Sequence, residues 1–229
     1  MKLPLILTII ALGCTHRVTA NPNSPALPLP TEKNGYVTAE AEHYVSQEKN
    51  EQRFWHVVSA ETLGKLPADH DEPHLQGASG GAYLEALPDT RITPKDKLLP
   101  GENFTNRPGT MAVLHYRVRF TTPGRYFVWV RCFATGTEDN GIHVGLNGTW
   151  PESGQRWQTT QKNRWHWESR QRTEANHLGE PGLLYLDIPS AGEHTISFSM
   201  REDGFEFDRW ALTINAGHDS ALAEEPVAP

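Results

Sequence analysis

Residues 111–133 read MAVLHYRVRFTTPGRYFVWVRCF and carry the clearest structural signal in the chain. In the first part of this stretch, Leu114, Tyr116 and Val118 alternate with polar residues, which is typical of a β-strand with one buried face. A Pro-Gly pair then indicates a turn, and residues 126–133 form a second run that is dense in aromatic and β-branched side chains. The stretch therefore predicts two strands joined as an antiparallel hairpin.

Further strand-like runs lie on both sides of this stretch. They cover residues 36–42, 142–146, 183–188, 194–200 and 207–214. The turn sequence between the third and fourth of these runs predicts a second hairpin. Residues 61–66 have room for one helical turn, but no window of a dozen residues has a helical period. Many short strands without alternating helices predict an all-β fold, either a sandwich or a barrel.

The chain has 229 residues, with 21 basic against 28 acidic residues and a net charge of −7. Because phosphates require a basic surface, this balance without a Lys/Arg-rich run argues against a nucleic-acid partner. We divide the chain into a signal peptide, a Pro-rich tether, one β-domain and a flexible tail. These parts cover residues 1–20, 21–34, 35–216 and 217–229, and the domain has long polar loops at 61–80, 88–110 and 148–182.

The N-terminus has the pattern of an export signal. Lys2 precedes an apolar stretch at 3–12 that is too short to span a bilayer, so we expect no transmembrane segment after processing. Cleavage after Ala20 predicts a secreted or periplasmic protein in which Cys132 is the single cysteine and no internal disulfide forms. The alternative is a lipoprotein signal, in which an acylated Cys14 anchors the protein to the membrane.

Four short motifs resemble carbohydrate-binding modules of families 6 and 35. In chain order they are GYVTAEAEHY at 35–44, GGAYL at 80–84, the pair HYRV and GRYFVWVR within 115–131, and GEHTI with FDRW within 192–210. A similar arrangement occurs in the C-terminal domain of family 115 glycoside hydrolases. The resemblance implies a jelly-roll β-sandwich of the galactose-binding type. This chain departs from those modules in its longer loops, and we expect it to act without a catalytic partner domain.

The resemblance also implies a structural Ca²⁺ ion. Glu40 and Glu42 share one face of the strand expected at 36–42, because side chains alternate along a strand. The resembling modules use two such glutamates with an aspartate of the closing strand, which assigns Glu40, Glu42 and Asp208 as ligands. Carboxylate oxygens suit Ca²⁺. The alternative is an ordinary solvated strand face.

Four of the seven tryptophans fall within one loop, at Trp150, Trp157, Trp165 and Trp167. Indole rings stack on the apolar faces of sugars, so these four residues are candidate ligand contacts. The alternative is that rings in this loop pack against the sandwich, and we expect at least two to do so. Asn140 is a further candidate contact, although Asp-Asn-Gly at this place is equally typical of a turn.

Two more segments are rich in acidic residues. Glu202, Asp203 and Glu206 could serve a metal, contact sugar hydroxyls or form a solvated turn. Residues 69–74 (DHDEPH) hold many potential metal ligands, but their spacing matches no known zinc motif. The chain also lacks the Gly-x-Ser-x-Gly, His-Glu-x-x-His and phosphate-loop patterns of common enzymes.

We therefore predict an exported module that binds a polysaccharide without catalysis. The alternatives are a small polysaccharide lyase or hydrolase on the same fold, and a cell-envelope adhesion lipoprotein. Removal of residues 1–20 leaves 19 basic and 28 acidic residues, a net charge of −9. This charge disfavours strongly anionic polymers unless Ca²⁺ or a local arginine cluster (Arg164, Arg170, Arg172) binds them.

Overall fold

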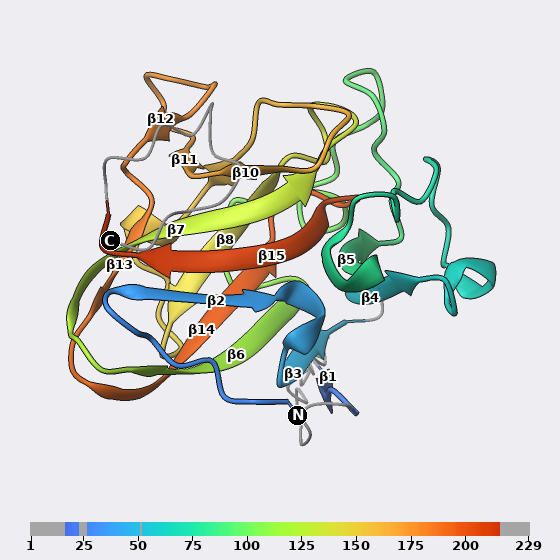
Figure 1. Ribbon diagram of the computed structural model, residues 1–229. Coiled ribbons are helices and arrows are strands. Elements are labelled where there is room, and N and C mark those ends of the chain that lie inside the picture. The colour runs from blue at the N-terminus through green and yellow to red at the C-terminus, as the bar shows by residue number, and fades with distance from the viewer. Residues whose placement is uncertain (1–16, 23–26, 51, 216–229) are drawn as a thin grey trace, which may run out of the picture.

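A computed structural model describes residues 17–22, 27–50 and 52–215 (Figure 1). The chain forms two packed antiparallel sheets, which confirms the all-β sandwich. The eight-stranded sheet has the order β1 (Arg17–Ala20), β3 (Ser46–Lys49), β6 (Val113–Phe120), β14 (Gly192–Met200), β8 (Gly141–Leu146), β9 (Trp157–Gln158), β11 (Arg170–Gln171) and β12 (Glu180–Pro181).

The seven-stranded sheet has a central path of five strands. Their order is β10 (His166–Glu168), β7 (Gly124–Phe133), β15 (Glu206–Thr213), β5 (Ala82–Leu87) and β4 (Phe54–Ser59). In addition, β13 (Tyr185–Ile188) pairs with β7, and β2 (Tyr36–Glu40) pairs with β15. Four short 3-10 helices complete the described elements: η2 (Ala41–His43), η3 (Leu63–Lys65), η4 (Ser79–Gly81) and η5 (Glu152–Gly154). The helical turn expected at 61–66 is thus present as η3.

The core lies between the sheets and follows the alternation seen in the sequence. In β6, Leu114, Tyr116 and Val118 are buried while Arg117 and Arg119 are exposed. The other sheet contributes large rings that pack edge to face against this layer, as Trp210 does on Tyr116 at a centroid distance of 5.4 Å. Burial of such rings stabilises the sandwich through the hydrophobic effect.

Both predicted hairpins are wrong. β6 pairs with β3 and β14 in one sheet, whereas β7 pairs with β10, β13 and β15 in the other. The second predicted pair is divided in the same way, since β13 and β14 belong to different sheets. The turn after Phe120 therefore crosses between the layers, and Phe120 packs on Tyr126 from the opposite sheet with centroids 5.1 Å apart.

The N-terminal segments lie closer to the sandwich than we predicted. Residues 17–20, expected to end the signal peptide, form β1 and pair with β3. In the expected tether, Glu32 is fully buried and accepts hydrogen bonds from Gly35, Thr121 and Thr122. Cys14 and the tail at 217–229 lie outside the described residues. Among the described residues, no helix has the length and apolar character needed to cross a membrane.

Two of the three long loops expected from the sequence, 61–80 and 88–110, connect consecutive strands, whereas the third, 148–182, contains η5 and the short strands β9 to β12. The loops that follow β5 and β8 gather at the top of the view in Figure 1, and the loop between β4 and β5 lies at its right-hand side. This last loop, residues 60–81, reaches strand β15, because Ser79 donates from its backbone N–H to Asp208 at 2.8 Å.

Candidate functional site

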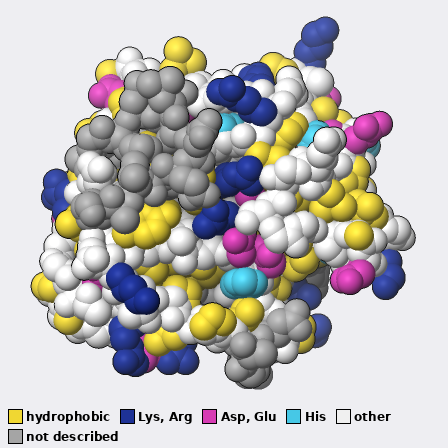
Figure 2. All heavy atoms as spheres, in the orientation of Figure 1, with side chains coloured by type: hydrophobic (Ala, Val, Ile, Leu, Met, Phe, Trp, Pro, Cys, Tyr) yellow, Lys and Arg dark blue, Asp and Glu magenta, His cyan; other side chains and the backbone are white. Residues whose placement is uncertain are grey.

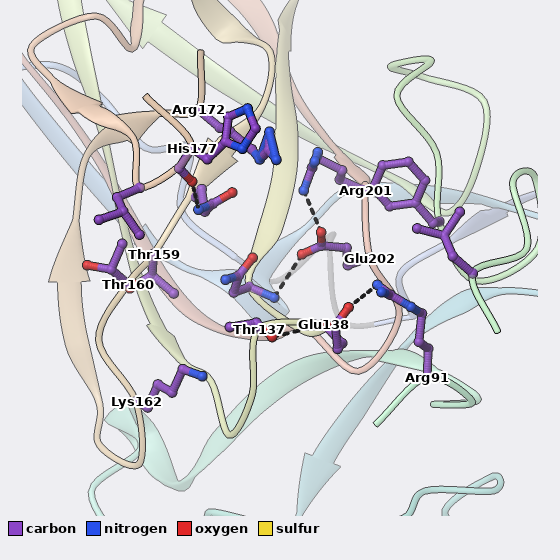
Figure 3. Close-up of a pocket in the computed structure, with 15 residues that line it drawn as sticks. Arg91, Thr137, Glu138, Thr159, Thr160, Lys162, Arg172, His177, Arg201 and Glu202 are labelled. Atoms are coloured by element: carbon purple, nitrogen blue, oxygen red, sulfur yellow. Dashed lines mark hydrogen bonds and ion pairs between the residues drawn. The ribbon is translucent and has the colours of Figure 1, made fainter. Parts of the chain in front are cut away.

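A groove of about 450 Å³ opens among the long loops. Its walls come from five separate segments, which bring four basic side chains and two carboxylates together: Arg91, Lys162, Arg172, Arg201, Glu138 and Glu202. In Figure 3, Arg91 and Arg201 lie on one side of this basic groove, while Arg172 and Lys162 lie on the other. Its volume is within the range of about 300–1,000 Å³ that is usual for small-ligand sites.

One wall of the basic groove is held by paired charges. Arg201 Nη1 lies 2.5 Å from Glu202 Oε1, and the backbone N–H of Asn140 donates to the other carboxylate oxygen at 3.1 Å. Burial raises the pKa of Glu202 while Arg201 opposes the rise. Arg91 pairs with Glu138 in the same wall. These partners leave the two carboxylates of the groove neutralised.

The opposite wall carries cations without such partners. Neither Lys162 nor Arg172 forms an ion pair with a carboxylate of the described residues (Figure 3). Lys162 is exposed and Arg172 is half-buried, so both charges are open to a ligand. The basic groove therefore has a positive excess in a protein whose net charge is negative.

Apolar and neutral polar groups complete the lining. Leu98 and Leu178 expose 40% and 68% of their surface, and the half-buried ring of Phe104 lies under the Arg201 guanidinium at 4.9 Å. Hydroxyl and amide side chains provide hydrogen-bonding groups: Thr137, Asn140, Gln158, Thr159 and Thr160. This combination of apolar surface, hydroxyls and charge suits a polar ligand with apolar C–H faces.

Two of the four candidate tryptophans belong to the interior of the protein. Trp157 is 0% exposed and packs on Phe205, and its indole N–H donates to the backbone carbonyl of Glu168 at 3.1 Å. Trp167 is 1% exposed and packs against Trp129 on the outer face of the seven-stranded sheet. Rings without exposed surface offer no face to a sugar, so their assignment as ligand contacts is corrected.

The other two tryptophans keep some exposed surface but lie outside the basic groove. Trp150 packs closely against the backbone at Gly109 and Gly145. Trp165 donates from its indole N–H to the carbonyl of His74 at 3.0 Å, and so fastens the 60–81 loop to the sandwich. Of the predicted ligand contacts, Asn140 is the one that lines the groove. Among the basic residues of the groove, Arg172 alone was a candidate from the sequence.

The three calcium ligands predicted from the resemblance lie near one another, but not in the arrangement that we expected. β2 ends at Glu40 and η2 begins at the next residue, so Glu42 does not continue the strand face as expected. All three carboxylates nevertheless lie in one neighbourhood: Glu40 and Asp208 both contact Ser79, and the charges of Glu40 and Asp208 act on Glu42. Burial, followed by these two charges, raises the pKa of Glu42 to about 8.

Arginines already neutralise part of this predicted calcium triad (Glu40, Glu42, Asp208). Arg209 Nε lies 3.3 Å from Glu40, and Arg131 pairs with Asp208. Figure 2 shows basic and acidic side chains side by side near the centre of the view. Oε2 of Glu40 and Oε2 of Glu42 are buried without a hydrogen-bond partner. The oxygen donors therefore fit a hard cation in chemistry, with two of the three carboxylates also held by arginines.

The turn at 201–206 is buried, which excludes the solvated alternative. Glu202, Asp203 and Glu206 are all at most 5% exposed. Each has a basic partner: Arg201 for Glu202, Arg53 at 2.8 Å for Asp203, and His74 at 2.6 Å for Glu206. Cys132 is free and buried.

One curated protein is similar to this chain over most of the chain's length. No family model matches the chain. It is 48% identical over 207 residues to an uncharacterized protein, P23, of Formosa agariphila, matching 89% of this chain and 50% of that protein. The chain thus spans about half the length of this relative.

Solved structures with a similar fold include two isolated modules of family 35. The module from Paenibacillus barcinonensis is 15% identical, with a TM-score of 0.42 and coverage of 78% of this chain and 98% of that one. The module from Clostridium thermocellum is 12% identical, with a TM-score of 0.34 and coverage of 77% and 96%. A third is the GH26-CBM35 β-(1,4)-mannanase from Podospora anserina, which combines a family 26 glycoside hydrolase with a family 35 module, at 16% identity and a TM-score of 0.45, covering 82% of this chain and 29% of that one.

Proposed function

We propose that this protein binds carbohydrate in the basic groove without catalysing a reaction, and that the sugar units carry carboxylate or sulfate groups. The observation that carries the proposal is the pair of open cations, Lys162 and Arg172, in a polar groove of a negatively charged protein. A charge-assisted hydrogen bond to a carboxylate or sulfate oxygen is roughly twice as strong as a neutral one. In this proposal the local positive charge of Lys162 and Arg172 outweighs the net negative charge of the protein, which by itself disfavours the binding of anionic polymers.

The remaining lining supports a sugar as the ligand. Phe104, Leu98 and Leu178 offer apolar surface for the C–H face of a pyranose ring, and the threonines offer hydroxyl contacts. In this proposal Phe104 takes the stacking role that we first assigned to tryptophans. Trp150 and Trp165 remain secondary candidates, since each retains a partly exposed ring.

Affinity electrophoresis tests the proposal. Wild-type protein is run through native gels that contain polygalacturonate, alginate or carrageenan as acidic polymers, and xylan, galactomannan or laminarin as neutral ones. We expect retardation by at least one acidic polymer and its loss in the Lys162→Ala/Arg172→Ala variant. Migration that no polymer retards contradicts the proposal, and depolymerisation of a polymer would favour the enzyme alternative instead.

A structural Ca²⁺ ion at the predicted calcium triad is a further part of the proposal. The unpartnered oxygens of Glu40 and Glu42 support it. Thermal unfolding with Ca²⁺ and with a chelator tests this part, with Glu42→Gln as the variant in which the difference disappears. An equal melting temperature in both conditions contradicts it.

Export through an N-terminal signal completes the proposal. Cleavage after Ala20 removes β1, whereas cleavage before Cys14 leaves β1 paired with β3. This pairing supports the lipoprotein alternative. The mass of the mature N-terminal peptide decides between the two sites: a diacylglyceryl-modified Cys14 supports the anchor, and a peptide that begins at Asn21 contradicts it.

A further inference from the structure

A second charged site lies under the 60–81 loop, on the outer face of the seven-stranded sheet. It consists of two overlapping groups, Asp71 with His74 and Glu206, and Asp69 with Asp71 and Glu85. Within each group, one potential ligand atom of every residue lies within 4.8 Å of the others. We call these five residues the acidic cluster. The DHDEPH segment thus gains from two strands the partners that its own spacing does not provide.

Strand register brings the two glutamates together. Glu85 of β5 lies directly opposite Glu206 of β15 in an antiparallel pair, where side chains on one face are neighbours. Like charges directly opposite each other destabilise a sheet. Their placement on adjacent strands beneath an acidic loop therefore requires compensation by a proton or a cation.

Glu85 is the residue that most clearly lacks a partner. It is 1% exposed, and neither carboxylate oxygen has a hydrogen-bond partner, although one of them faces Asp69 and Asp71. Burial, followed by the charge of Glu206 and then of Asp69, raises the pKa of Glu85 to about 11. Oε2 of Glu206 is also buried and unpartnered. A buried carboxylate without a counter-charge is costly, and coordination of a cation removes that cost.

His74 is held in place from three sides. Its ring stacks on Phe133 with centroids 3.7 Å apart, and its backbone is fixed by Tyr83 and Trp165. Nδ1 lies 2.6 Å from Glu206 Oε1. Such support around a ligating histidine is typical of metal sites, because it fixes the orientation of the ring.

We propose that the acidic cluster binds one divalent transition-metal ion, with Zn²⁺ preferred over Ca²⁺. An imidazole nitrogen among carboxylate oxygens favours zinc, whereas calcium prefers ligands that are all oxygen. The cluster differs in this respect from the predicted calcium triad, which has no histidine and is paired with arginines. The two sites are therefore distinguishable by metal as well as by residue.

Isothermal titration of chelator-treated protein with Zn²⁺, Mn²⁺ and Ca²⁺ tests the inference. We expect binding of one Zn²⁺ ion that His74→Gln and Glu85→Gln each weaken at least about tenfold. The matched controls are His70→Gln, an exposed histidine of the same loop, and Glu42→Gln in the calcium triad; both should bind Zn²⁺ as the wild type does.

Equal zinc affinity in the wild type and both cluster variants overturns the proposal, as does preference for Ca²⁺. If either variant fails to fold, anomalous scattering at the zinc edge from a zinc-soaked wild-type crystal takes its place. A peak between His74 and Glu85 supports the site, and its absence at a zinc concentration that saturates binding overturns it.

Discussion

The basic groove and the acidic cluster handle charge in opposite ways, although they share neighbouring segments of the chain. Glu202 in the groove is paired with Arg201, whereas Glu85 in the cluster has no hydrogen-bond partner and is acted on mainly by acidic neighbours. The groove is open and its surplus charge is positive. The cluster is largely buried, with Glu85 and Glu206 buried and the other three residues half-buried, and its surplus charge is negative. The first site therefore suits an anion and the second a cation, because an uncompensated buried charge is costly.

The largest expected effect comes from breaking a paired charge in the groove. Arg201→Met leaves Glu202 buried without its cation and should lower the free energy of unfolding by about 3–5 kcal/mol. Urea unfolding measures this loss. Arg164→Met is the control, since Arg164 is exposed and should change stability by less than about 0.5 kcal/mol. A similar loss in the free energy of unfolding for both variants would show that the Arg201–Glu202 ion pair does not stabilise this wall of the groove.

Removal of the open cations should affect binding rather than stability. Lys162→Ala and Arg172→Ala should each lower the affinity for an acidic polymer about tenfold or more, because a hydrogen bond to a charged group contributes about 1.5–3 kcal/mol. Gel retardation over a series of polymer concentrations gives both affinities. Arg164→Ala serves as the matched control, and equal losses in all three variants would point to a general charge effect.

In the acidic cluster, replacing Glu85 by a side chain that cannot ionise should raise stability rather than lower it. Since burial raises the pKa of Glu85 from 4.5 to about 11, the metal-free protein keeps this group protonated at pH 8. The contribution of this proton to stability is complete below about pH 4.5 and is lost as the pH rises from there toward 11. At pH 8, Glu85→Gln should therefore be more stable than the metal-free wild type by about 1–3 kcal/mol.

The pH series sharpens this prediction. Between pH 5 and pH 8, the stability of the metal-free wild type should decline more steeply than that of Glu85→Gln, and saturating Zn²⁺ should reduce the decline. Glu42→Gln is measured in parallel, because the pKa of Glu42, raised to about 8, produces a slope in the same window. Parallel curves for wild type and Glu85→Gln would contradict the burial of an uncompensated carboxylate.

The smallest expected effect concerns the loop that covers the cluster. Trp165→Phe keeps a ring but removes the hydrogen bond to the carbonyl of His74, which should cost about 0.5–1.5 kcal/mol. Zinc affinity should fall as well, since His74 is held less firmly. An unchanged zinc affinity would mean that the stacking on Phe133 alone orients the ring.

Local patterns in the sequence predicted most long strands but not how they pair. The alternation of Leu114, Tyr116 and Val118 identifies a buried face, and that face is the same whether the next strand lies in the same sheet or the opposite one. For this reason the segment at 111–133 was predicted correctly as two strands and incorrectly as a hairpin. The short strand β1 was not predicted, because residues 17–20 resemble the end of an export signal.

The sites were predictable only where a single segment carries them. Asn140 was found beside its turn, and Asp69 to His74 were noted as dense in ligands. Their partners in space are separated by long stretches of chain, so no local spacing could reveal them. One signal was available: Glu85 stands in an otherwise apolar strand, AYLEAL, where a charge needs a partner. The tryptophan-rich loop misled us because the burial of Trp157 and Trp167 depends on residues far away in the sequence, such as Phe205 for Trp157 and Trp129 for Trp167.

The central claim is that the basic groove recognises the charge of an acidic polysaccharide. The most direct test compares retardation by an acidic polymer that binds in the panel with retardation by the carboxyl-reduced or desulfated form of the same polymer. We predict strong retardation by the acidic form, and none by the neutral form or in the Lys162→Ala/Arg172→Ala variant. Retardation by the acidic form should be weaker at 0.3 M than at 0.05 M salt, because the Debye length falls from roughly 1.4 nm to roughly 0.5 nm. Equal retardation by both forms, or retardation that the double variant retains, would contradict it.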